Sequence, residues 1–231
     1  MRINKFIASN SGISRRKADE LILEGKVFLN GKKITKLGTT VVPEKDKIEI
    51  NGKEVKATGK KLYLALNKPT GYITTRSDEK NRKTVMELIP KDKNLKPAGR
   101  LDKESEGLLL LSNDGEFINK LTHPKFECEK EYYVVTDKPL TAKEINKIER
   151  GVKIDGKKTY PSKIKMLKTN EKGATLTITI HEGRNRQVRK MFASLGYNVE
   201  YLRRIRIGKI KIGSLQKGRY RQLKLTEINV N

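Results

Sequence analysis

Four consecutive leucines, Leu108 to Leu111, place the strongest constraint on how this chain can fold. Gly107 precedes them and the turn signal Asn113-Asp114-Gly115 follows, so the run predicts a short strand buried on both faces. The polar loop just before this strand carries Asp102 between two basic residues. A loop anchored to a rigid, buried strand is a common place for a reactive carboxylate, although most such aspartates only stabilise a turn. From these residues alone, both roles of Asp102 stay open.

The charge balance indicates the kind of partner. The 231 residues include 52 Lys and Arg against 27 Asp and Glu, which gives a net charge of +25 and a pI of about 10.0. Such an excess favours a polyanion, because binding neutralises phosphates and releases counterions. The charge is spread along the chain instead of lying on one amphipathic segment, which favours nucleic acid over a membrane surface.

Several classes of site are not expected. Cys128 is the only cysteine, and His123 and His181 lack metal-ligand spacing, so we expect no disulfide within the chain and no metal. We find no glycine-rich phosphate loop and no dinucleotide fingerprint, and therefore expect no cofactor. We also find no secretory signal and no run of apolar residues that could span a bilayer, so we expect a cytoplasmic protein without membrane contact.

Residues 1–56 are predicted to form one small domain. Two helices with apolar stripes are expected, the second capped by Ser14, followed by short strands joined through Asn-Gly turns. Arg15, Arg16 and Lys17 lie in the first turn of that second helix, where the helix dipole disfavours cations. They either bind phosphates or form a solvated basic face. Residues 57–61 are small and charged, and are predicted to be a linker.

Residues 62–231 are predicted to form a second domain of the α+β class. Strands and helices follow one another without strict alternation, which favours a mixed, largely antiparallel β-sheet flanked by helices. A capping box at Thr141 and Glu144 opens one helix, and the alternation from 175 to 180 predicts a half-buried strand.

The end of the chain is especially basic, with 13 Lys and Arg against 3 Asp and Glu in residues 182–231. Arg186, Arg189 and Lys190 have the spacing of one helical face. Arg204 and Arg206 alternate with isoleucines and are expected to point to the same side of a strand. These groups either bind phosphates, or one of them pairs with Asp102 and keeps the pKa of that carboxyl low.

Two sets of motifs resemble known families. Ser14-Arg15-Arg16-Lys17-Ala18-Asp19, followed by Gly25-Lys26-Val27 and an Asn-Gly turn, resembles the alpha-L RNA-binding domain of ribosome-associated proteins. The second set spans about residues 62 to 225 and resembles the ribosomal RNA pseudouridine synthases of the RsuA/RluB type. Its motifs, in order, are Lys68-Pro69-x-Gly71, Gly99-Arg100-Leu101-Asp102 with the following leucines, Lys130-x-Tyr132, Glu182-Gly183-Arg184-x-x-Gln187-Val188-Arg189, Leu202-x-Arg204 and Gly218-x-x-Arg221.

This resemblance implies an enzyme that isomerises uridine to pseudouridine in ribosomal RNA, more specifically in that of the large ribosomal subunit, without a cofactor. It implies that Asp102 is the catalytic carboxylate, acting as a nucleophile or as a base. Tyr132 would pack on the uracil and serve proton transfer, and Arg189 would pair with Asp102. With the basic residues above, the expected RNA-binding set is Arg15, Arg16, Lys17, Arg100, Arg184, Arg186, Gln187, Arg204 and Arg206.

The alternative is a non-catalytic factor that binds ribosomal RNA during ribosome assembly. Net charge and an RNA-binding domain fit both functions, whereas an aspartate kept in a basic cleft favours the enzyme. His181, at the end of a strand, is a further candidate for RNA contact. The expected partner is ribosomal RNA or a pre-ribosomal particle, and the expected state is a monomer.

Overall fold

The computed structural model describes residues 1–57, 59, 61–91 and 94–228, and they form two compact units. The first comprises Met1–Leu62, Asp92–Lys96 and Ser112–Gly115, and the second comprises Tyr63–Lys91, Pro97–Leu111 and Glu116–Asn231. The linker predicted at 57–61 lies partly outside the described residues. The domain limits 1–56 and 62–231 stay predictions.

The first unit packs two helices against a small sheet. Helix α1 (Ile3–Asn10) and α2 (Arg15–Leu23) precede a four-stranded sheet of order β2-β1-β3-β4. The strands are β1 (Val27–Leu29), β2 (Lys32–Ile34), β3 (Ile48–Ile50) and β4 (Lys53–Glu54). The core contains both predicted apolar stripes: Ile3, Phe6 and Ile7 from α1, and Ala18, Leu21 and Ile22 from α2. Ser14 accepts a hydrogen bond from the Lys17 amide at 3.0 Å, which confirms the predicted N-cap.

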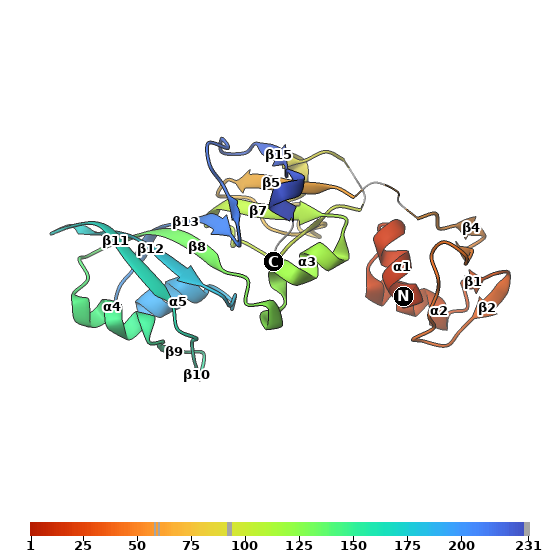
Figure 1. Ribbon diagram of the computed structural model, residues 1–231, viewed down its shortest axis with the longest axis horizontal. Helices are drawn as coiled ribbons and strands as arrows, with labels where there is room; N and C mark the ends of the chain where they lie inside the picture. The colour runs from red at the N-terminus through yellow and green to blue at the C-terminus, as the bar shows by residue number, and fades with distance from the viewer. Residues whose placement is uncertain (58, 60, 92–93, 229–231) are drawn as a thin grey trace. The chain divides into compact units, whose positions relative to one another are not determined.

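The second unit is built on a nine-stranded sheet, whose main path has the order β11-β12-β8-β13-β7-β5-β15 (Figure 1). In addition, β14 pairs with β13 and β6 pairs with β7. The strands in chain order are β5 (Tyr63–Lys68), β6 (Lys96–Pro97), β7 (Glu106–Ser112), β8 (Lys130–Thr136), β11 (Lys163–Asn170), β12 (Gly173–Ile180), β13 (Val199–Ile207), β14 (Ile210–Lys211) and β15 (Tyr220–Gln222). A separate hairpin joins β9 (Lys153–Ile154) to β10 (Lys157–Lys158).

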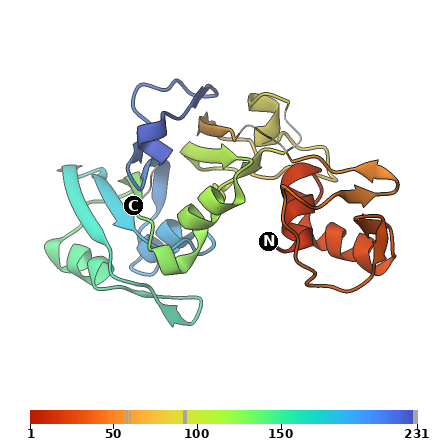
Figure 2. The ribbon, with the colours of Figure 1, turned by 45° about the vertical axis from the view of Figure 1, so that its right-hand side comes forward.

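Helices and short turns connect these strands. They are η1 (Val85–Leu88), α3 (Gly115–Thr122), η2 (Pro124–Phe126), α4 (Ala142–Glu149), α5 (Gln187–Ala193) and α6 (Leu225–Ile228). Helices α4 and α5 lie along the β11–β12 end of the sheet in both views (Figure 1, Figure 2). The capping box of Thr141 and Glu144 opens α4 as predicted.

The α+β class with a largely antiparallel sheet is confirmed. Strand β8 pairs antiparallel with β12 and β13, whereas β13 pairs parallel with β7. All seven residues of β7 are buried, and Leu108 to Leu111 have no exposed surface, as the leucine run predicts. Burying a leucine side chain contributes about 1.5–3 kcal/mol, so β7 anchors the segments on either side of it.

Strand β11 was not predicted. It lies at the end of the sheet and, among the described strands, pairs with β12 alone. Most of its residues, including three lysines, are exposed. Edge strands often carry lysine, because its charge prevents pairing with another strand. These lysines make the apolar alternation that indicates a strand harder to recognise in the sequence.

The expectation that Arg204 and Arg206 share one side of their strand is wrong. The pairing of β13 with β8 shifts register between them, so Arg204 lies opposite Tyr132 and Arg206 lies opposite Glu131. Tyr132 and Glu131 are consecutive in β8 and therefore face opposite sides of the sheet. Because residues directly opposite one another share a side, the bulge sends the two arginines to different faces.

Gly107 brings β7 and β13 together. It lies opposite Arg204 in the parallel pair and has a φ of 107°. A Cβ atom at this position would lie 2.2 Å from the backbone oxygen of Arg204, which is closer than any real contact. Only glycine therefore allows the two strands to approach here.

We predict that Gly107→Ala destabilises the second unit by on the order of 3 kcal/mol, because it adds a backbone clash to an unfavourable φ. A chain of this size should lose roughly 10 °C in Tm. All eight tyrosines lie in residues 63–231 and the chain has no tryptophan, so tyrosine fluorescence during heating reports on this unit. Gly115→Ala is the control, because a Cβ there meets nothing within 4 Å. Equal melting of the two variants would contradict the prediction.

Candidate active site

The loop that carries Asp102 is held in place through its backbone. The Lys68 ammonium, at the end of β5, donates to the carbonyl oxygens of Asp102 at 3.0 Å and Ser105 at 2.8 Å. The Thr74 hydroxyl donates to the Leu101 carbonyl at 2.7 Å and accepts from the Leu101 amide at 3.2 Å. These bonds fix the peptides on both sides of Asp102 and leave its carboxylate unused.

Lys68 is fully buried, which is exceptional for a lysine. A third bond, from its ammonium to the Pro69 carbonyl at 3.0 Å, completes the three donors of the group. Burial lowers the pKa of Lys68 from 10.5 to about 8, although the nearby carboxylates of Asp102, Glu104 and Glu106 oppose this change. The cost of burying this charge is offset by the carbonyls that surround it.

Asp102 lines a cavity of about 360 Å³, which is within the range of pockets that take small ligands. Strand β8 contributes Tyr132 to the wall, and β13 contributes Arg204 directly opposite it in the register. The Arg204 guanidinium carbon lies 6.0 Å from the centre of the Tyr132 ring. An acid, an aromatic ring and a cation thus share one cavity.

Asp102 and Arg204 both keep unused polar atoms. Among the described residues, the Asp102 carboxylate has no hydrogen bond and no ion pair. Arg204 is buried, its Nε donates to the Leu108 carbonyl at 2.8 Å, and its Nη2 has no partner in the described part of the chain. A buried donor of this kind is uncommon and is typical of a site that awaits a ligand.

Arg189, on α5, does not line the cavity. Its Nη1 donates to the Val199 carbonyl at 2.5 Å, and no ion pair within 4.0 Å joins it to Asp102. Burial and the neighbouring Arg186 lower the pKa of Arg189, whereas Asp102 and Glu104 raise it. Arg189 is therefore near enough to Asp102 to interact through space. Its Nη1 is engaged by Val199, whereas its Nε is buried and has no partner in the described part of the chain.

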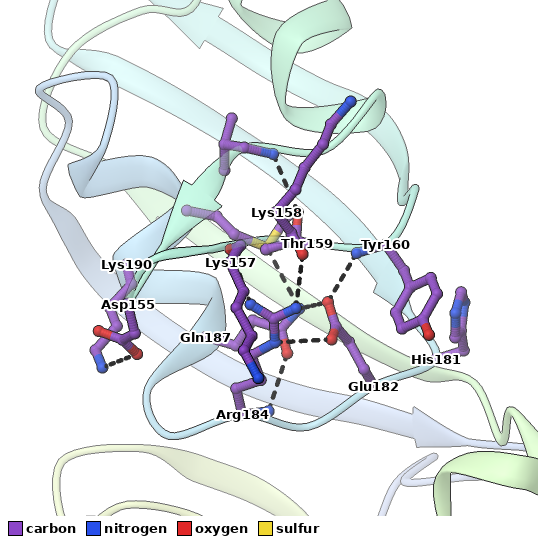
Figure 3. Close-up of polar contacts among 12 residues, drawn as sticks. Asp155, Lys157, Lys158, Thr159, Tyr160, His181, Glu182, Arg184, Gln187 and Lys190 are labelled. Carbon is purple, nitrogen blue, oxygen red and sulfur yellow. Dashed lines mark hydrogen bonds and ion pairs between the residues drawn. The ribbon is translucent and has the colours of Figure 1, made fainter.

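Two of the residues expected to bind RNA are engaged in the network of Figure 3. Arg184 donates from Nη1 and Nη2 to the carbonyls of Lys157 and Lys158, at 3.0 and 2.7 Å, and from Nε to Glu182 at 3.0 Å. Gln187 is buried, donates to Glu182 at 2.5 Å and accepts from the Arg184 amide at 3.0 Å. Both residues line the cavity; Arg184 holds the β9–β10 hairpin directly, and Gln187 fixes Glu182, which binds Arg184.

The other expected RNA-binding residues differ in whether their side chains are engaged in ion pairs and in how exposed they are. Arg206 pairs with Glu131 at 2.7 Å and Glu129 at 3.0 Å, and Arg186 pairs with Glu104 at 3.1 Å on the cavity wall. Arg100 lines the cavity and is exposed. In the first unit, Arg15, Arg16 and Lys17 are all exposed at the start of α2, and Lys17 pairs with Glu20 at 2.8 Å.

Sequence reasoning did not give Lys68 a role. The sequence feature that could have indicated such a role is the position of this lysine, immediately after five predominantly apolar strand residues and before Pro69-Thr70-Gly71. A charged residue that continues a buried strand has to find partners, and proline and glycine release the carbonyls around it from regular pairing.

We predict that Lys68→Met lowers kcat of any reaction that uses the Asp102 carboxylate by roughly 10-fold or more, because the Asp102 loop loses its anchor. The buried carbonyls left without a donor should also cost about 1–3 kcal/mol of stability. Lys165→Met, which removes an exposed lysine from β11, is the control. Unchanged kcat in Lys68→Met would show that the loop does not need this anchor.

The lowered pKa of Lys68 predicts how stability depends on pH. Because its pKa is about 8 in the folded protein and 10.5 is the ordinary value, the unfolded chain binds more protons between these values. The stability of the wild type relative to Lys68→Met should therefore rise with pH from about 8 to 10.5, and stay constant below 8. Urea unfolding of both proteins across this range measures the difference, and a fall would contradict the assignment.

Metal-ligating clusters and membrane-spanning helices are both absent from the part of the chain that the structure describes. In these ranges, no group of three or more His, Cys, Asp and Glu is arranged to hold a metal ion. None of the helices within the same ranges is long and apolar enough to cross a bilayer.

The chain is similar to known proteins over nearly its whole length. The family model described as RNA pseudouridylate synthase matches residues 62–194, and the S4 domain model matches residues 1–48. Ribosomal large subunit pseudouridine synthase B of Bacillus subtilis is 44% identical over 98% of this chain and 93% of that protein. Dual-specificity RNA pseudouridine synthase RluF of Escherichia coli is 38% identical over 96% of this chain and 75% of that protein. A solved structure titled as a pseudouridylate synthase has a TM-score of 0.73 and 32% identity, and covers 100% of this chain and 99% of its own.

Proposed function

The chain belongs to the RNA pseudouridine synthase family, with an S4 domain at its N-terminus, and from this premise we propose that it converts uridine to pseudouridine in large-subunit ribosomal RNA. The choice of the large ribosomal subunit comes from the name of the Bacillus subtilis relative. A monomeric state and a cytoplasmic location stay predictions.

The observation that supports this function best is a free carboxylate inside a basic cavity. The reaction breaks the bond between N1 of the base and C1′ of the ribose and forms a bond from C5 to C1′. The proton on C5 leaves and N1 gains one, so no oxidant, reductant or energy source is consumed. We propose that Asp102, whose two oxygens are free, acts on the ribose as a nucleophile or as a base.

Tyr132 and Arg204 have complementary roles in this proposal. A target uridine has to leave its stack, which costs a few kcal/mol. Stacking on Tyr132, which is 9% exposed and lines the cavity, returns about 1–3 kcal/mol. The unpartnered Nη2 of buried Arg204 is available to the carbonyl oxygens of the uracil or to Asp102.

Arg189 acts in this proposal through its charge. When RNA fills the cavity and displaces water, the carboxylate of Asp102 needs a nearby cation. Arg189 and Arg204 both interact with charges in this region, and Arg204 reaches the cavity directly. A protein that only clamps RNA has no use for an aspartate here, because the carboxylate repels phosphates.

Replacement of Asp102 tests the function. We expect Asp102→Asn to lose roughly 10⁴-fold or more in pseudouridine formation, since the amide lacks the negative charge, and to bind RNA within about threefold of wild type. The measurement is pseudouridine mapping in both ribosomal RNAs from cells that lack the gene and carry wild type or variant. Glu104→Gln, which removes an exposed neighbouring carboxylate, is the control. Full modification by Asp102→Asn would favour the RNA-binding assembly factor.

The arginines can be ranked by parallel substitution. Arg189→Gln and Arg204→Gln should each lower kcat by roughly 10–100-fold, with the larger loss for Arg204, because it lies on the cavity wall. Arg206→Gln should keep kcat, since this arginine is engaged by Glu129 and Glu131. Single-turnover rates separate these effects from RNA affinity. A larger loss for Arg206→Gln than for either of the others would refute the ranking.

A further inference from the structure

An exposed tyrosine lies next to the cavity on the segment that follows the β9–β10 hairpin. Tyr160 is 58% exposed, more than Tyr220 at 44% and Phe126 at 42%. Its ring is not packed into the core but lies beside His181, with ring centres 5.0 Å apart and planes tilted by 49° (Figure 3). Its hydroxyl makes no hydrogen bond with the described residues.

His181 connects this tyrosine to the cavity. It follows β12 and lines the cavity wall, next to Glu182. Its Nε2 is buried and has no hydrogen-bond partner among the described residues. An unpartnered ring nitrogen beside an exposed aromatic ring is suited to a ligand that has both a flat face and polar edges, such as a nucleobase.

The position of Tyr160 is fixed by the network in Figure 3. The Tyr160 amide donates to Glu182 at 3.0 Å, and Glu182 is itself bonded to Arg184 and Gln187. The two bonds from Arg184 to the hairpin carbonyls hold the residues just before Tyr160. The ring is therefore pre-positioned, which reduces the entropy lost when a base binds.

Positive charge lies on the same hairpin. Lys157 and Lys158 give their carbonyls to Arg184, but their side chains are exposed and their ammonium groups have no partner among the described residues. Free lysines next to an aromatic platform are the usual components of a site for single-stranded RNA, where the ring takes the base and the cations take the phosphates.

We propose that Tyr160 and His181, with Lys157 and Lys158, form a binding site for a nucleotide that flanks the target uridine. This proposal rests on the proposed function and extends it to substrate recognition. The unstacked uridine enters the cavity at Tyr132, and a neighbouring base of the same strand stacks on Tyr160. Holding a neighbour outside the cavity favours uridines in loops, whose flanking bases are already free to stack.

Two substitutions separate the ring from its hydroxyl. The substrate is a large-subunit rRNA transcript with tritium at C5 of uridine, because each turnover releases that hydrogen. Tyr160→Leu should raise KM about 10-fold with kcat within about twofold, and Tyr160→Phe should match wild type. Tyr220→Leu, at a tyrosine that is 44% exposed on β15, should leave KM unchanged. Equal KM for Tyr160→Leu and wild type, or equal losses in the Leu and Phe variants, would overturn the proposal.

The salt dependence of RNA affinity separates stacking from charge. Lys157→Gln with Lys158→Gln should reduce the slope of log Kd against log salt by about 1 to 2, and Tyr160→Leu should leave the slope unchanged. If the double lysine substitution leaves the slope unchanged and Tyr160→Leu reduces it, Tyr160 only supports the hairpin and the proposal is overturned.

Fluorescence tests the site without catalysis. The chain has no tryptophan, so Tyr160→Trp introduces a single one. The transcript should quench its emission strongly, also when Asp102→Asn is present, whereas a tryptophan introduced by Tyr220→Trp should respond little. Quenching without any tritium release by the wild type would mean that the proposed function fails and the binding site stands. Tritium release by the wild type without quenching would mean that the proposed function holds and the proposed binding site fails.

Discussion

The catalytic unit depends on a positive charge that is buried where the chain turns toward the cavity. The ammonium group of Lys68 binds the backbone carbonyls of Asp102 and Ser105, and the acid is held without using its carboxylate oxygens. A carboxylate fixed by its side chain would have its lone pairs occupied, whereas one fixed by its backbone stays available for chemistry. Lys68 is thus a positioning residue, and the leucine strand β7 provides the rigid support behind it.

A chain with this much positive charge does not use all of it on RNA. Arg184 supports a hairpin, Arg206 is held by two glutamates, and Arg189 binds a backbone carbonyl. A guanidinium group is suited to binding carbonyls and carboxylates, because it is planar, has several N–H donors and remains charged when partly buried. Arg100, Lys157 and Lys158, whose side-chain cations have no partner among the described residues, are exposed. Long-range attraction of RNA needs only the sum of these charges, but contact with phosphates needs the free ones.

The cavity and the Tyr160 site are connected by one short segment. Residues 181 to 187 run from the end of β12 to the start of α5, and all of them line the cavity. Arg184, in the same segment, also holds the β9–β10 hairpin. A single loop can therefore relate the place of the reacting base to that of its neighbour. Its rigidity comes from Glu182, which receives bonds from three different residues: Tyr160, Arg184 and Gln187.

The sequence by itself determined the elements whose signals are local: the buried leucine strand, the helix stripes of the first unit, the Ser14 cap and the α+β class, because periodicity and capping depend on neighbouring residues. The motifs also brought Asp102, Tyr132 and Arg204 to notice. Only the tertiary structure decided what each cation does. Arg204 and Arg206 differ by a bulge that a β-period of two does not reveal, and Lys68 and Arg184 find carbonyls 34 and 27 residues away. A long flexible side chain can reach many partners, and only the folded backbone selects one.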